Sequence, residues 1–256
     1  MSTLIFDIET GPLPRTDLAE IVPTFEAPSN WKDPEKIRAC IAEKEAAWFQ
    51  SAALSAVTGR VLAIGWLDPY ADEHGFFASG HEAADLTEFW SFIAPSGFLN
   101  GDLVGFNSNR FDLPFLMRRS WRLGVPVPAQ LLGGRYLPRE CIDISDTWRC
   151  GVREDSISLD NLARFLGVGR KNGDGADFAS LCDMNRAAAL DYLANDLRLT
   201  LRCAIALGLI APPSAGQTAL RFAPLGPLPS AEMRTQRRNA TCGQHASDRS
   251  TTTTNA

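Results

Sequence analysis

The chain has 256 residues, 45% of them hydrophobic, so it is long and apolar enough for one large domain with a full core. No apolar run reaches the ~18 residues that a membrane span needs. Its net charge is −5: residues 1–210 carry 28 acidic and 20 basic side chains, and residues 211–256 carry 2 acidic and 5 basic ones. An acidic body of this kind excludes nonspecific coating of nucleic acid but allows local binding of a short polyanion.

Residues 4–10 (LIFDIET) are predicted to form a buried strand. Successive strand side chains point to opposite faces, so the apolar residues share one face and Asp7 and Glu9 share the other, with their Cβ atoms about 6.5–7 Å apart. Two carboxylates in a central strand are costly to desolvate unless a positive partner compensates them, and a divalent metal ion is the simplest such partner. Taken alone, the segment also fits an edge strand with one polar face.

An insertion, residues 15–58, separates this strand from the next. Its middle is predicted to be helical, because Asp33 is a suitable N-cap and Pro34 suits the first helical position. Beyond the insertion, hydrophobic periodicity and turn residues predict the remaining elements. These are strands at 60–66, 75–78 and 103–106, a helix after His81, a helix at 111–123, a strand or extended edge at 142–148, and helices at 158–166 and about 185–207.

The composition changes after the last predicted helix. Residues 212–256 are rich in Pro, Ser, Thr, Arg and Gly and have too little apolar content to offset the entropy of ordering. We therefore expect a largely disordered tail behind one domain that spans residues 1–211.

Cysteine usage and the start of the chain bear on location. The six cysteines form no C-x-x-C pair and no Cys/His cluster, which argues against structural zinc. The chain also lacks a basic start followed by an apolar core and a small-residue cleavage site, so secretion is not indicated. Reduced thiols in the cytoplasm are the expectation.

Two further acidic segments follow the first. In residues 107–112 (NSNRFD), Asp112 stands at the start of a predicted helix, where free N–H groups and the helix dipole suit a carboxylate. Read alone, it also fits an ordinary helix-start aspartate. In residues 191–196 (DYLAND), Tyr192 and Asp196 are four residues apart and hence on one helical face, although a solvated helix face would look the same.

Taken together, the three segments resemble the motifs of the DEDD superfamily of 3′-5′ exonucleases: Asp7-x-Glu9, Asn107-x-x-x-Phe111-Asp112 and Tyr192-x-x-x-Asp196. The resemblance spans residues 1 to about 207 and is closest to stand-alone proteins related to the exonuclease domain of family B DNA polymerases. One branch of the superfamily has His five residues before the last Asp, and the other has Tyr four before it. The chain resembles the Tyr branch. This implies an α/β fold of the ribonuclease H-like type, a mixed sheet flanked by helices.

The resemblance implies an enzyme, a phosphodiester hydrolase that shortens single-stranded DNA from its 3′ end with two Mg²⁺ or Mn²⁺ ions. Hard oxygen ligands favour these ions over zinc, and two ions can activate a water and stabilise the departing 3′ oxygen. The expected metal ligands are Asp7, Glu9, Asp112 and Asp196, with Asp7 bridging both ions. Tyr192 has a reference pKa of about 10, so we expect it to orient the attacking water or contact the phosphate rather than act as a base.

Several residues near the motifs are weaker candidates for contacting the substrate. Thr10 and Asn107 are candidates for touching the terminal nucleotide, Phe111 is more often a core residue, and Arg110 and Lys171 are candidates for steering the strand unless they are ordinary solvated surface. The loop that carries Lys171 is rich in glycine, but it follows a helix rather than a strand and contains no G-K-[ST], which argues against a phosphate cradle.

Three functions remain open at this point. The first is a 3′-5′ exonuclease on single-stranded DNA, and the second is an RNA-trimming exonuclease, because nothing in the sequence identifies a reader of the 2′-OH. The third is a binding module that kept the fold and lost turnover, against which the presence of all four carboxylates argues. The expected partner is the 3′ end of a single-stranded nucleic acid, DNA rather than RNA.

Overall fold

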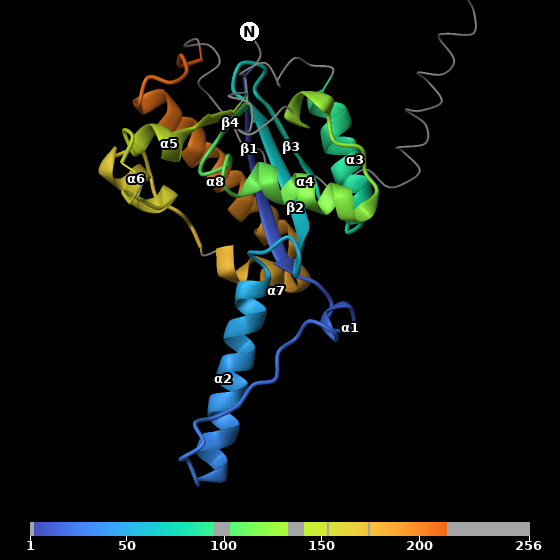
Figure 1. Ribbon diagram of the computed structural model, residues 1–256. Helices are drawn as coiled ribbons and strands as arrows, with labels where there is room; N and C mark the ends of the chain where they lie inside the picture. Colours follow the sequence, from blue (N-terminus) through green and yellow to red (C-terminus); the bar gives the residue numbers. More distant parts are fainter. Residues whose placement is uncertain (1–2, 95–102, 133–140, 153, 174, 214–256) are drawn as a thin grey trace, which may run out of the picture. The chain divides into compact units, whose positions relative to one another are not determined.

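The computed structural model describes residues 3–94, 103–132, 141–152, 154–173 and 175–213 (Figure 1). All of them belong to one compact unit, Met1–Leu220. Within these segments, no helix has the length and apolar character that crossing a membrane requires. The predicted tail at 212–256 falls almost entirely outside the described residues, so both the tail and the domain boundary at 211 stay predictions.

A five-stranded mixed sheet forms the centre of the fold, with the order β3-β2-β1-β4-β5. The middle strand, β1, pairs antiparallel with β2 and parallel with β4; β2 continues antiparallel to β3, and β4 continues parallel to β5. The mixed sheet flanked by helices that was expected for a ribonuclease H-like fold is confirmed. The strands are β1 (Leu4–Pro12), β2 (Gly59–Asp68), β3 (Glu73–Phe77), β4 (Leu103–Gly105) and β5 (Cys141–Asp143).

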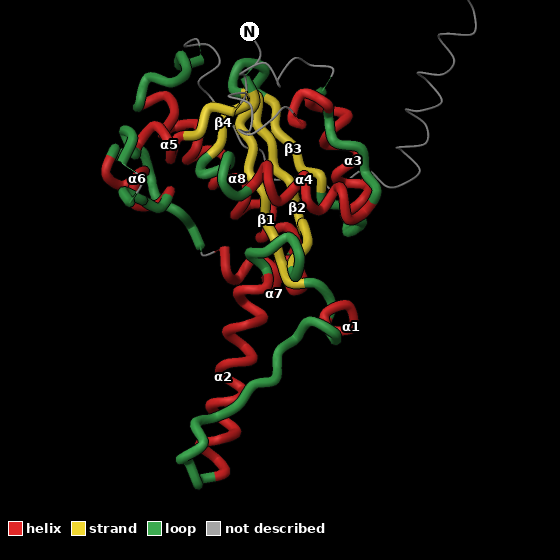
Figure 2. The backbone as a smooth tube through the Cα atoms, viewed as in Figure 1, coloured by secondary structure: helices red, strands yellow, loops and turns green. Residues whose placement is uncertain are grey.

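Helices cover both faces of the sheet, as the yellow strands between red helices in Figure 2 show. One face packs on α3 (Glu82–Ile93) and α4 (Asp112–Leu123), and the other face of β1 and β2 packs on α8 (Arg186–Ala206). The apolar side of β1 faces the α3 and α4 layer, so its acidic side faces α8. Beside α8 lie the shorter helices α6 (Leu159–Phe165) and α7 (Phe178–Met184).

A glycine in β2 lets α8 approach the sheet closely. Gly65 pairs with Asp7 in the sheet register, and a Cβ at this position would lie 2.9 Å from side-chain atoms of both Leu193 and Leu197 of α8. That distance is too short for any other residue unless these leucine side chains or the helix shift. Because Gly65 has no side chain, α8 sits directly over the acidic side of β1.

The insertion contains α1 (Arg15–Leu18) and the long helix α2 (Pro34–Ala52), whose C-terminal end contacts β1. The Asp33 side chain accepts hydrogen bonds from the N–H groups of Glu35 and Lys36, at 2.9 and 3.4 Å. The predicted N-cap and helix start are therefore confirmed. The helix then leads through a short turn into β2.

One predicted element is half wrong. Residues 142–148 were expected to be a strand or an extended edge, but β5 ends at Asp143 and helix α5 (Ile144–Trp148) follows at once. The Asp143 side chain accepts hydrogen bonds from the N–H groups of Ser145 and Asp146, so it caps a helix whose residues look strand-like on their own. The other predicted strands and helices are present, with ends shifted by a residue or two, and α7 was not predicted.

Candidate active site

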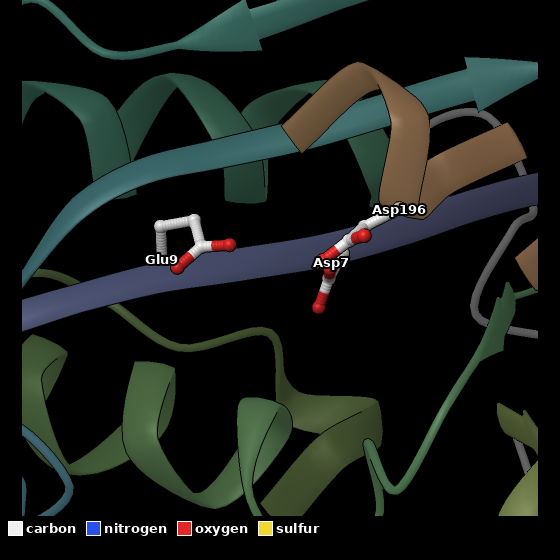
Figure 3. Close-up of side chains that lie close together, drawn as sticks. All are labelled: Asp7, Glu9 and Asp196. Carbon is white, nitrogen blue, oxygen red and sulfur yellow. The ribbon is translucent and has the colours of Figure 1, made fainter. Parts of the chain in front are cut away.

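Three carboxylates from two elements meet on the α8 side of the sheet (Figure 3). Asp7 and Glu9 come from β1 and Asp196 comes from α8, and each offers an oxygen that lies within 4.8 Å of the other two. Glu9 and Asp196 are 8% and 1% exposed. The period-two alternation of β1 places the first two, and the close packing of α8 over β1 brings in the third.

The fourth predicted carboxylate, Asp112, lies beside Asp7. It is buried at the start of α4, where it accepts a hydrogen bond of 3.1 Å from the backbone N–H of Ile8, and its carboxyl lies close to that of Asp7. The same N–H also donates to Asp7 at 3.0 Å. All four sequence-predicted carboxylates are therefore gathered in one place.

Asp143, which the sequence did not indicate as a site residue, holds the turn before Asp112. Asn107 adopts a left-handed conformation, with φ of 61°, and its N–H donates to the buried Asp143 carboxylate at 2.8 Å. Asn109 donates its N–H to the other oxygen of Asp143 at 2.9 Å. One carboxylate thus caps α5 and fixes the turn that leads into α4. The sequence signal was an aspartate at the end of an apolar strand.

Lys171 brings a positive charge to the cluster. Its ammonium lies 2.6 Å from Asp196 Oδ2 and donates to the Tyr192 hydroxyl at 2.9 Å. The Tyr192 hydroxyl also lies close enough to Asp196, four residues further along α8, to feel its charge. The loop that carries Lys171 comes close to the ring, since a Cβ at Gly173 would lie 3.0 Å from it.

Burial and crowding disfavour the charged forms of the carboxyls. Burial raises the pKa of Asp7 to about 7, and the charge of Asp196 adds to this shift. Burial, followed by the charge of Asp7, likewise raises the pKa of Glu9 and of Asp112. Burial also raises the pKa of Asp196 although Lys171 opposes the change. The cluster therefore carries more negative charge than its surroundings compensate.

The same environment keeps the partners of Asp196 protonated. Burial lowers the pKa of Lys171, but the charge of Asp196 and the bonds to Asp196 and Tyr192 outweigh it, and the net pKa is raised. Burial and the charge of Asp196 raise the pKa of Tyr192 above its usual value. At neutral pH Lys171 is thus an ammonium and Tyr192 a phenol.

The residues present fit a bound cation. Among the described side chains, Asp196 Oδ1 is a buried atom with no hydrogen-bond partner, although the other oxygen of the same group pairs with Lys171. A buried carboxylate oxygen without a donor is costly. A metal ion held by Asp7, Glu9 and Asp196 would supply the missing positive partner.

An open cleft of about 1160 Å³ lies beside the cluster. Glu9 and Lys171 of the cluster line it, and so do Thr10 and Phe111. Its other walls come from the C-terminal half of α2, from the start of α7 and from the residues just before α7.

Two of the predicted substrate contacts are engaged elsewhere. The Arg110 side chain forms an ion pair of 3.1 Å with Asp146, and Asn107 is held by Asp143 through its backbone. Neither residue is among the described residues that line the cleft. The structure brings Thr10, Phe111 and Lys171 to the cleft and leaves these two apart from it.

No protein-family model matches the chain, and no curated protein shows significant similarity to it. Among solved structures, the fold is similar to that of the family B DNA polymerase from the hyperthermophilic archaeon Pyrobaculum calidifontis, with a TM-score of 0.52 at 20% sequence identity. The match covers 80% of this chain and 24% of the polymerase chain. At this identity the likeness concerns the fold, and this chain is an α/β protein with the same arrangement of a mixed sheet between helices.

Proposed function

We propose that the protein is a metal-dependent 3′-5′ exonuclease of the DEDD superfamily, Tyr branch, acting on single-stranded DNA. The observation that carries the proposal is the convergence of Asp7, Glu9 and Asp196 within 4.8 Å, with Glu9 also lining an open cleft. The order of the three sequence motifs supports it, and the likeness in fold to a family B DNA polymerase is in keeping with it.

The metal ligands that we propose are Asp7, Glu9, Asp112 and Asp196, since their oxygens are hard ligands that suit Mg²⁺ or Mn²⁺. Asp7 interacts with both Asp196 and Asp112, which supports a role shared between two ions. When bound, two such ions would supply an activated water and charge stabilisation for the departing 3′ oxygen.

The chain's own residues then position the reacting groups. Tyr192 stays protonated and is held by Lys171, so its hydroxyl is able to orient the water or a phosphate oxygen but not to remove a proton. The ammonium of Lys171 attracts the phosphate to the carboxylate cluster. In the reaction the water oxygen bonds to phosphorus, the bond from phosphorus to the 3′ oxygen breaks, and that oxygen takes a proton. The terminal nucleotide leaves with its 5′ phosphate.

DNA is the substrate that we propose. RNA is the alternative, and the digestion experiment described below compares the two. The difference between them is the 2′-OH, which a protein reads through a hydrogen bond. A cytoplasmic location is also part of the proposal, because the cysteines in the described part of the chain are free thiols.

The test is digestion of 5′-labelled single-stranded DNA and RNA of one sequence, with Mg²⁺, with Mn²⁺ and with chelator. Wild-type protein should give a ladder of labelled products that needs metal, and Asp7→Ala should give none. Glu88→Ala is the matched control, because Glu88 is an exposed carboxylate on α3, on the opposite face of the sheet. Immediate release of a labelled mononucleotide would contradict the 3′-5′ direction. An intact substrate after incubation with folded wild-type protein would overturn the proposal that the protein is an enzyme.

A further inference from the structure

The insertion contributes a wall to the cleft that leads to the carboxylate cluster. Glu43, Ala46, Ala47 and Gln50 of α2 all line it. Their spacing of i, i+3, i+4 and i+7 puts them on one face of the helix. The cleft therefore lies between this face of α2 and the site at β1.

We propose that this face of α2 is the surface on which the unpaired bases at the 3′ end of the substrate lie. The inference rests on the proposed exonuclease function. Glu9 and Lys171 line the same cleft as Ala46 and Ala47, so the space that reaches the carboxylates is bounded by α2. A strand whose last phosphodiester bond lies at Glu9 and Lys171 has this space for its adjoining nucleotides.

The chemistry of the walls favours bases over phosphates on the α2 side. The α2 side offers small and apolar side chains, including Ala46, Ala47 and Leu54, with one acidic residue, Glu43. Glu43 repels phosphates, whereas the described cation that lines the cleft, Lys171, lies on the opposite side at the cluster. The backbone of the strand should therefore follow Lys171, and the bases should turn toward α2.

The cleft is also large enough for this arrangement. Its volume of about 1160 Å³ exceeds the ~300–1,000 Å³ that is usual for small-molecule sites, so it has room for more than one nucleotide. Two aromatic rings border it: Phe49 of α2, which has the Arg15 guanidinium over one face, and Phe111 before α4, which packs on Phe115. Stacking of bases on aromatic rings is tolerant of sequence, as an exonuclease that shortens any strand requires.

The first test fills the cleft from the α2 side. Ala47→Trp should weaken binding of a single-stranded oligonucleotide by about tenfold or more, roughly the loss of one stacked base, and raise KM in the digestion assay. Mn²⁺ binding should be unchanged, because the carboxylates are untouched. Ala42→Trp is the matched control, since Ala42 is exposed on the same helix and does not line the cleft. Thermal unfolding of both variants checks their folding.

The second test needs no variant. Wild-type protein with Ca²⁺ in place of Mg²⁺ is irradiated with an oligonucleotide that carries 4-thiothymine at its last two positions, and the crosslinked peptide is identified. Crosslinks within residues 43–54 support the inference, and crosslinks confined to other segments overturn it. An active wild-type protein whose affinity and KM are unchanged by Ala47→Trp overturns the inference alone. A wild-type protein without exonuclease activity overturns the proposed function, and the inference with it.

Discussion

Replacing Asp7 by Asn should stabilise the metal-free protein while it abolishes activity. Burial raises the pKa of Asp7 from 3.8 to about 7 in the folded protein, and the charge of Asp196 adds to this shift. A carboxyl with a raised pKa binds more protons in the folded than in the unfolded chain, so the free energy of unfolding decreases as the pH rises from about 4 to about 7. Above this window Asp7 is charged in both states, and its burial lowers the free energy of unfolding by the full amount.

The magnitude follows from the size of the shift. A difference of about 3 pKa units corresponds to about 4 kcal/mol, at 1.36 kcal/mol per unit. Because Glu9 and Asp112 beside Asp7 also have raised pKa values, part of this repulsion is relieved when they bind protons. We therefore expect Asp7→Asn to raise the free energy of unfolding by about 2–4 kcal/mol at pH 8, and by less at pH 5.

The assay is urea unfolding of chelator-treated protein at both pH values. Glu88→Gln serves as the control for loss of an exposed carboxylate and should change the free energy of unfolding by less than about 0.5 kcal/mol. Addition of Mn²⁺ should stabilise the wild-type protein and leave Asp7→Asn nearly unchanged. The reasoning fails if Asp7→Asn is no more stable than wild type at pH 8, or if its gain is the same at pH 5.

Two further predictions concern cations that pair with buried carboxylates. Lys171→Met should raise Mn²⁺ affinity in calorimetric titration, because Asp196 loses its competing ammonium. The same change should lower the digestion rate, because Tyr192 loses its partner; unchanged Mn²⁺ affinity would count against this reasoning. Arg119→Met should lower the free energy of unfolding by about 3–5 kcal/mol in urea titration. The Arg119 guanidinium forms two bonds of 2.8 Å to the largely buried Glu82, which would be left without its cation, and a loss below about 1 kcal/mol would refute this reading.

The features that could be predicted from the sequence are those with local causes. The two faces of β1 follow from the alternation of its side chains, and the start of α2 follows from an N-cap aspartate and a proline. The same holds for Ser158, which caps α6 by accepting from the N–H of Asn161. In each case the residues that decide the structure lie within a few positions of one another.

The features that could not be predicted depend on tertiary contacts. Asp143 reads as a polar residue at the end of a strand, and its bonds to the turn at 107–109 exist only after β4 and β5 pair. Gly65 reads as an ordinary strand glycine, and its close approach to α8 appears only when that helix packs on the sheet. Arg110 looked like a cation for the substrate, but Asp146 is near enough to pair with it.

The position of Lys171 shows how a site can attract metal ions and still fold without them. A cluster of four carboxylates with no cation would oppose the packing of α8 on β1, because the acidic side of the strand faces that helix. Lys171 neutralises one side of Asp196 and leaves the other oxygen without a donor. Lys171 also acts on Asp7 and Glu9, but burial and the neighbouring carboxylates outweigh its charge there. The chain thus offsets part of the repulsion during folding and leaves the rest to a bound cation.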